Sequence, residues 1–191
     1  MQGMATSSAD FPDALPAAAP APAFSLLDVR TGSERSFHDL AGPQGTLIVF
    51  LCAHCPYVLH VLPKLIELSN EFFPQGISTI GISANDPIAY PEDAPDKLRA
   101  MAEENDLPFP LLFDGSQEIA RAYTAACTPD FFLFNREKQL VYRGQLDDSR
   151  PGNGIPVTGE DLRAALDAVL SGKPVAAEQK PSIGCNIKWK S

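Results

Sequence analysis

The feature that most constrains this chain is an apolar run that leads directly into a Cys-x-x-Cys pair and then into a helical pattern. Residues 46–51 (TLIVFL) are continuously apolar and rich in β-branched residues, as in a strand that is buried on both faces. In residues 56–73 apolar side chains recur at helical spacing, with Pro63 expected to kink the helix. The sequence therefore predicts a strand–turn–helix unit with Cys52 at the end of the strand and Cys55 in the first turn of the helix.

This placement gives the two cysteines a specific chemistry. The first turn of a helix presents unpaired N–H groups and a partial positive charge, which we expect to stabilise a thiolate at Cys52. A thiolate is the nucleophile of thiol–disulfide exchange. The imidazole of His54 would add to this stabilisation, and the alternative is that His54 only faces solvent. Cys52 and Cys55 are therefore the candidate catalytic pair, with His54 as a supporting residue.

The rest of the chain alternates between predicted strands and helices, which is typical of the α/β class. The expected strands are 23–30, 36–38, 46–51, 76–83, 110–113, 131–134 and 139–143. The expected helices are 56–73, 94–105, 117–124 with Ser116 as its cap, and 159–170 with Thr158 as its cap. We expect a central mixed sheet with helices on both faces, extended at the front by a β-hairpin.

The domain boundaries follow from composition. Residues 1–22 form an Ala/Pro-rich segment that we expect to be a flexible leader, residues 23–172 form one domain, and residues 173–191 form a tail that carries Cys185. The leader has no basic residue before Arg30, and its prolines interrupt any apolar run, so it resembles no export or transit signal. We therefore expect a cytoplasmic protein.

Charge and cysteine spacing exclude several classes of function. The net charge is −9 at pH 7 without a Lys/Arg cluster, so neither nucleic acid nor an anionic membrane is an expected partner. The four cysteines do not form two C-x₂₋₄-C knuckles, so no zinc site is expected. No cofactor motif stands out, and we expect none to be bound.

A second element of the site is the dipeptide Thr128-Pro129, which comes just before the predicted strand 131–134. The order of elements, a β-α-β unit followed by a hairpin and a final helix, is that of thioredoxin. Thioredoxin-like proteins place a cis-proline at this point, packed against the Cys-x-x-Cys pair. The resemblance thus predicts a cis Thr128-Pro129 bond whose backbone holds a substrate chain in an extended pose.

The resemblance extends over most of the chain beyond the leader. It is carried by CAHCPYV (52–58), ISANDPIAYPEDAP (82–95), AACTPDFFLFN (125–135), YRGQLDDSRPGNG (142–154) and KPSIGCNIKWK (180–190). These stretches resemble a thioredoxin-fold redoxin of the AhpC/TSA superfamily, and most closely its peroxiredoxin-like members with a CxHCPYV motif. The resemblance implies thiol redox chemistry at Cys52 and Cys55.

The chain departs from both branches of this superfamily. In peroxiredoxins the attacking cysteine corresponds to Cys55, but the threonine three residues earlier is here Cys52, and the stretch 128–131 lacks their arginine. In thioredoxins an aromatic residue precedes the first cysteine and a buried acid lies six positions before it; here they are Leu51 and Thr46. These departures argue against peroxidase chemistry and against an ordinary thioredoxin.

Two further cysteines are candidate redox residues. Cys127 lies next to Thr128 and would take part in the redox chemistry; the alternative interpretation is that it is only a small buried side chain. Cys185 lies in the tail and would serve as a resolving thiol, or be incidental to a tail held down by Ile187 and Trp189.

The leading hypothesis is a thiol–disulfide oxidoreductase in which Cys52 attacks and Cys55 resolves. Its partners would be a protein or small-molecule disulfide and a thiol reductant. One alternative is a divergent peroxidase with Cys55 as the attacking thiol. The other is a non-enzymatic redox-sensing or adaptor module.

Overall fold

The computed structural model describes residues 5–10 and 14–191. Its main sheet has seven strands in the order β3-β2-β6-β5-β4-β8-β9, and β4 pairs parallel with β5 and antiparallel with β8. The predicted mixed sheet and its N-terminal hairpin are thereby confirmed, but the second hairpin strand, expected at 36–38, lies at Glu34–Ser36 because Ser36 caps a helix that begins at Phe37. The strands are β2 (Ser25–Asp28), β3 (Glu34–Ser36), β4 (Gly45–Phe50), β5 (Ile77–Ser83), β6 (Leu111–Phe113), β8 (Asp130–Asn135) and β9 (Leu140–Gly144).

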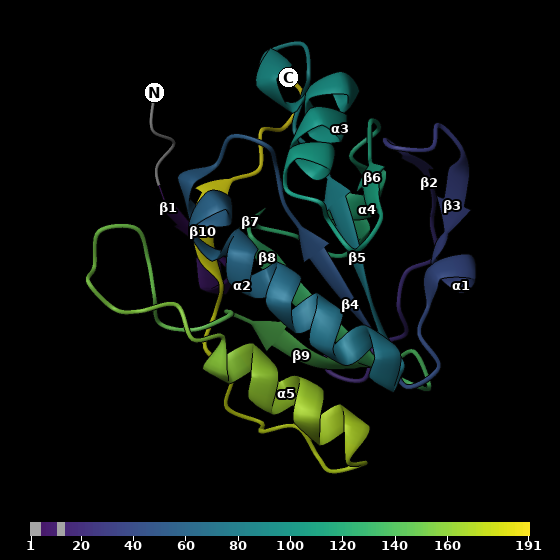
Figure 1. Cartoon of the computed structure of the whole chain (residues 1–191), viewed down its shortest axis with the longest axis vertical. Coiled ribbons are helices and arrows are strands. Elements are labelled where there is room, and N and C mark those ends of the chain that lie inside the picture. Colours follow the sequence, from purple (N-terminus) through teal and green to yellow (C-terminus); the bar gives the residue numbers. More distant parts are fainter. Residues whose placement is uncertain (1–4, 11–13) are drawn as a thin grey trace.

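Helices cover both faces of this sheet, as expected. They are α1 (Phe37–Leu40), α2 (Pro56–Phe72), α3 (Pro95–Glu104), α4 (Glu118–Ala122) and α5 (Glu160–Leu170). Successive residues of β4 point to opposite faces: Val49 packs in the core that holds α2, α3 and α5, and Phe50 in the core that holds α1 and α4. In Figure 1, α2 and α5 lie side by side, joined by two hydrogen bonds of 2.6 Å from Arg163 to Glu71.

Two predicted helix caps were wrong by one residue. The N-cap of α4 is Gln117 and that of α5 is Gly159, both in the left-handed region with φ of 66° and 72°. Ser116 and Thr158 come one residue earlier and accept the N–H of Glu118 and Glu160 at 3.2 and 3.3 Å. The hydroxyls thus do bond the first helical N–H groups, but from outside the cap, because a left-handed residue turns the chain into each helix.

The segments that we expected to be a leader and a tail both contribute strands to a second, smaller sheet. Its order is β1-β10-β7, from β1 (Ala5–Ser7), β10 (Ile183–Asn186) and β7 (Cys127–Thr128). Residues 1–4 and 11–13 of the expected leader lie outside the described residues. In Figure 1 the yellow β10 runs beside β1, close to the start of α2. The C-terminal segment is therefore built into the fold next to the Cys-x-x-Cys pair.

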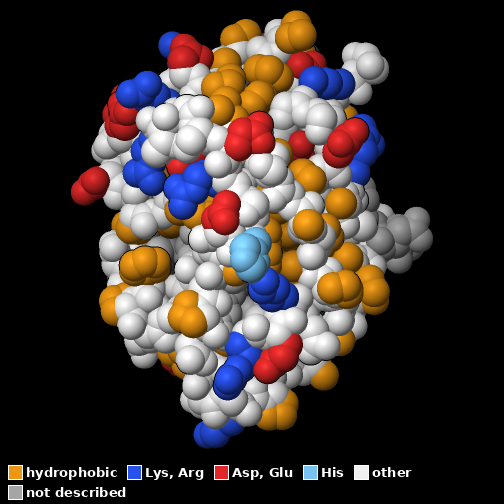
Figure 2. Space-filling model, turned by 90° about the vertical axis from the view of Figure 1, so that its right-hand side faces the viewer, with side chains coloured by type: hydrophobic (Ala, Val, Ile, Leu, Met, Phe, Trp, Pro, Cys, Tyr) orange, Lys and Arg blue, Asp and Glu red, His pale blue; other side chains and the backbone are white. Residues whose placement is uncertain are grey.

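The surface carries charges of both signs. On the face drawn in Figure 2, Lys and Arg side chains are interspersed with Asp and Glu, and hydrophobic side chains are scattered among them. None of the helices that the structure describes is long and apolar enough to cross a membrane.

Candidate redox site

The Cys-x-x-Cys pair lies where β4 passes into α2, as predicted. The Leu51 N–H bonds the Ile82 carbonyl and keeps the chain in the sheet up to the first cysteine. Cys55 is the N-cap of α2, and its carbonyl accepts the N–H groups of Val58 and Leu59. Pro56 suits the first helical position because the missing N–H has no partner there. Both cysteines are buried, with exposures of 1% for Cys52 and 0% for Cys55.

The Thr128-Pro129 loop contacts both sulfurs. The Thr128-Pro129 bond is cis, which confirms the prediction. The Oγ1 of Thr128 lies 3.6 Å from Cys52 Sγ, and its carbonyl accepts a hydrogen bond from Cys55 Sγ at 3.4 Å. One residue of the loop therefore positions both members of the pair.

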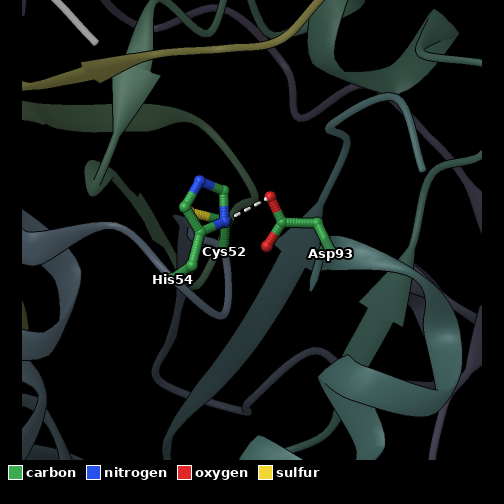
Figure 3. Close-up of side chains that lie close together, drawn as sticks. All are labelled: Cys52, His54 and Asp93. Carbon is green, nitrogen blue, oxygen red and sulfur yellow. Dashed lines mark ion pairs between the residues drawn. The ribbon is translucent and has the colours of Figure 1, made fainter. Parts of the chain in front are cut away.

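A buried carboxylate, Asp93, organises the other side of Cys52. Its Oδ1 accepts the Ala53 N–H at 2.9 Å, and its Oδ2 accepts a hydrogen bond from Asn85 Nδ2 at 2.8 Å. Figure 3 shows His54 turned toward this carboxylate, with Nδ1 2.8 Å from Oδ2. The His54 ring also lies parallel to that of Tyr90, with centroids 6.5 Å apart. His54 is thus held against an acid instead of facing solvent alone.

The sequence did not point to Asp93. The buried acid of thioredoxins corresponds to position 46, where the Thr46 hydroxyl instead accepts the Gly42 N–H at 3.1 Å. Asp93 follows β5 in a short 3₁₀ turn and differs in no local pattern from Glu92 beside it. The only signal was its position within the family-like stretch 82–95. Asp130, which follows the cis-proline, accepts the Ala126 N–H at 3.1 Å.

A third thiol lies on the far side of Cys55. Strand β10 places Cys185 opposite Thr128, whose carbonyl accepts the Cys55 thiol, and the side chains of Cys185 and Cys55 shift each other's pKa. The Tyr57 N–H in the first turn of α2 points at the Cys185 sulfur. Cys127 is fully buried, its thiol faces the Pro129 carbonyl at 3.6 Å, and burial raises its pKa. The structure therefore places Cys185 on the strand that pairs with Thr128 beside Cys55, whereas the Cys127 thiol is turned to the Pro129 carbonyl.

These contacts shift the pKa values of Cys52 and Cys55 in the opposite sense to our expectation. Interactions with Cys185 and then with Cys52 lower the pKa of Cys55 well below the usual thiol range. The hydrogen bond to Cys55, burial and the Asp93 carboxylate raise the pKa of Cys52. We had expected the helix N-terminus to stabilise the thiolate at Cys52. When the reduced pair loses its first proton, these contacts favour the negative charge on Cys55 over Cys52.

Three of these side chains form a group that could hold a metal ion. Cys52, His54 and Asp93 each offer a ligand atom, and these atoms lie within 4.8 Å of one another. A thiolate, an imidazole and a carboxylate suit Zn²⁺. The ion pair and hydrogen bonds of Asp93 explain why these groups lie together without requiring an ion.

Comparisons with known proteins agree with this geometry. The family model described as AhpC/TSA family matches residues 17–143. The thiol-disulfide oxidoreductase ResA of Halalkalibacterium halodurans is 23% identical over 116 residues, which cover 61% of each chain. The chain thus spans less than two thirds of the length of the curated relatives it matches.

Solved structures match over nearly the whole chain. An uncharacterized conserved protein from Geobacillus kaustophilus is 50% identical with a TM-score of 0.93, covering 100% of this chain and 98% of that one. A hypothetical protein from Sinorhizobium meliloti 1021 is 41% identical with a TM-score of 0.92, covering 98% of this chain and 100% of that one. More distant thioredoxin and disulfide-interchange structures share the fold. The chain has a thioredoxin-like fold and belongs to the AhpC/TSA family.

Proposed function

We propose that this chain is a thiol–disulfide oxidoreductase with Cys52 as the attacking thiol and Cys55 as the resolving thiol. The observation that carries the proposal is the joint placement of the two sulfurs at a strand–helix junction, both in contact with Thr128 before the cis-proline. The relatives named as thiol-disulfide oxidoreductases support the same reaction class.

The reaction would proceed in two exchange steps. The Cys52 thiolate attacks one sulfur of a substrate disulfide, the substrate S–S bond breaks, and a mixed disulfide forms. The Cys55 thiolate then attacks Cys52 Sγ and releases the second substrate sulfur as a thiolate. The substrate gains two electrons, and the Cys52–Cys55 disulfide is returned to dithiol by an external thiol reductant.

Asp93 and His54 would serve the first step as positioning groups. Asp93 fixes the backbone between the cysteines through the Ala53 N–H, and it holds the imidazole of His54 near Cys52. A proton leaving Cys52 then has a nitrogen and a carboxylate within reach. This dyad would take the place of the buried acid that the chain lacks at Thr46.

The test is insulin reduction by the full chain with dithiothreitol as reductant. Cys52→Ser should reduce the rate to the uncatalysed background, because no sulfur remains to open the substrate disulfide. Cys127→Ala should keep most of the activity, since Cys127 has no hydrogen bond to either member of the pair. Full activity in Cys52→Ser would refute the proposal.

One observation favours a second candidate, a divergent peroxidase in which Cys55 attacks. Its lowered pKa makes Cys55 the thiolate of the closed site. Against this, Cys52 replaces the peroxide-binding threonine. The nearby Arg143 also donates to the Thr124 carbonyl at 2.6 Å and pairs with Asp130 at 3.5 Å. Stopped-flow oxidation by hydrogen peroxide that is fast in Cys52→Ser and absent in Cys55→Ser would select the peroxidase.

The wider role follows from the reaction. We propose that the chain reduces disulfides of proteins or small molecules in a reducing cytoplasmic environment, and so takes part in antioxidant defence and cell redox homeostasis. An adaptor whose disulfide only controls partner binding would show very slow exchange and a redox-dependent set of bound partners.

A further inference from the structure

The edge of β7 that a substrate chain is expected to use is already occupied by the chain itself. Strand β10 pairs antiparallel with β7, with Cys185 opposite Thr128 and Asn186 opposite Cys127. This is the extended pose that we expected Thr128-Pro129 to impose on a substrate. The chain thus presents its own cysteine at the site in the manner of a substrate strand.

The contact between β10 and β7 is close because of Gly184. A Cβ at this position would lie 2.0 Å from the Thr128 carbonyl oxygen and 2.6 Å from its carbon. Backbone atoms cannot give way as the end of a flexible side chain can. Any residue other than glycine would therefore push β10 away from Thr128.

The segment around Cys185 is held on both sides. Before it, the Ser8 N–H donates to the Ser182 carbonyl, the Ser182 N–H donates to the Ser8 hydroxyl, and the Ser182 hydroxyl donates to the Gly144 carbonyl at 2.7 Å. After it, the Lys188 N–H bonds Asn85 Oδ1 at 2.9 Å. These contacts hold Cys185 in a defined place beside Cys55, and a fixed neighbour reacts as if at high concentration.

Cys55 is the sulfur that the other two thiols share. The side chains of Cys52 and Cys185 both interact with it and shift its pKa, and its thiol donates to the carbonyl of Thr128, the residue opposite Cys185. The Tyr57 N–H points at Cys185 Sγ from the first turn of α2, but the interaction with Cys55 and burial raise the pKa of Cys185 by more than this donor lowers it. Cys185 is therefore placed to attack Cys55, and in the Cys52–Cys55 disulfide Cys55 carries no negative charge, so the charge repulsion that raises this pKa is then absent.

We propose that Cys185 is a third redox residue, carried on a substrate-like strand, which exchanges with the Cys52–Cys55 disulfide to give a Cys55–Cys185 disulfide. The Cys185 thiolate attacks Cys55 Sγ, the Cys55–Cys185 bond forms, and the Cys52–Cys55 bond breaks with Cys52 leaving as a thiolate. The proton lost by Cys185 balances the one that Cys52 can take up, and no outside oxidant or reductant is consumed. This inference rests on the proposed function only for the origin of the first disulfide.

The consequence is a site with two oxidised forms. In one form Cys52 and Cys55 are joined and β10 is free to leave β7. In the other form β10 is tethered covalently over the site and Cys52 is a free thiol. An external substrate strand would compete with β10 for the edge of β7, so the tethered form is closed to it.

Disulfide mapping of the full chain tests this proposal. Reduced protein is oxidised with one equivalent of glutathione disulfide, quenched in acid, alkylated, digested and examined by mass spectrometry. We expect a Cys55–Cys185 peptide beside Cys52–Cys55 in the wild-type protein, and Cys55–Cys185 as the main disulfide in Cys52→Ala. Complete alkylation of Cys185 in both proteins would overturn the proposal.

Gly184→Ala tests the role of the strand while every cysteine stays in place. The added Cβ should displace β10 and lower the yield of Cys55–Cys185 by about tenfold, because opening of the strand then costs less. Ile183→Ala removes an exposed side chain without adding a clash and should keep the yield. An unchanged yield of the Cys55–Cys185 disulfide in Gly184→Ala would refute the role of β10 as a substrate-like strand. If that variant does not fold, the wild-type map decides alone.

The two proposals fail separately in these experiments. Insulin reduction is measured on the same preparations. If the protein reduces insulin but forms no Cys55–Cys185 disulfide, the redox role of Cys185 is refuted and the oxidoreductase proposal stands. If the Cys55–Cys185 disulfide forms but the protein does not reduce insulin, the oxidoreductase proposal is refuted and Cys185 acts only in an internal redox switch.

Discussion

The two cysteines of the pair face different surroundings, although they are only three residues apart. Cys52 lies beside a buried carboxylate, Asp93, and beside the hydroxyl of Thr128. Cys55 lies at the start of α2, where it meets the Val58 N–H and the thiol of Cys185. The first environment disfavours a thiolate, and the second favours one.

This difference teaches that a strand–helix junction alone does not decide which sulfur carries the charge. The donors near Cys55 include Cys185, which belongs to a strand that pairs with β7. If β10 leaves, Cys55 loses the contact that most lowers its pKa. The pair is then free to share its charge in favour of Cys52, which is the arrangement that the proposed attack needs.

The largest effect is expected from removing the acid on the Cys52 side. Asp93→Ala leaves the Ala53 N–H and Asn85 Nδ2 without their acceptor inside the protein, which should cost about 2–4 kcal/mol of unfolding free energy. Urea unfolding of the reduced protein measures this cost. Glu92→Ala, next to it and half exposed, should change stability by less than about 0.5 kcal/mol. Equal losses in the two variants would show that Asp93 does not organise the site.

A smaller effect is expected on the Cys55 side. Cys185→Ala removes the side chain that most lowers the pKa of Cys55, so that pKa should rise by about 1–2 pH units. The ultraviolet absorbance of the thiolate should then be lost at a higher pH as the protein is acidified. Cys127→Ala should leave this titration unchanged. A titration unaffected by loss of Cys185 would contradict the contact between the two sulfurs.

The smallest effect concerns the hydroxyl of Thr128. Thr128→Val keeps the branched shape of the residue in β7 but removes the group that lowers the pKa of Cys52. The pKa of Cys52 should rise, so the pH at which exchange accelerates should move upward and the rate at neutral pH should fall by about fivefold. Thr128→Ser, which retains the hydroxyl, should restore the rate. Equal exchange rates in the valine and serine variants would show that the Thr128 hydroxyl does not affect the reactivity of Cys52.

The main sheet and the pair itself were predictable because they rest on local patterns. Residues 46–51 are apolar without interruption, and the helical spacing after Pro56 is regular, so β4, α2 and their junction follow from periodicity. The cis-proline was predicted from its position relative to that junction and the hairpin, by resemblance. Each of these features has a signal within a short stretch of sequence.

The parts that could not be predicted depend on contacts between distant segments. Asp93 reaches Ala53 across 40 residues, and its neighbour Glu92 carries the same charge at the surface. Strand β10 has four residues and no clear alternation, and it exists because β1 and β7 pair with it from both sides. Tertiary pairing, and not local propensity, made the expected tail part of the site.

The most direct test of the central claim is the identity of the cysteine that opens a substrate disulfide. The full-length Cys55→Ser variant, which lacks the resolving sulfur, is mixed with glutathione disulfide, quenched in acid and mapped by mass spectrometry. The account predicts a stable glutathione adduct on Cys52, with Cys127 and Cys185 left as free thiols. An adduct on Cys185 with Cys52 unmodified would contradict it.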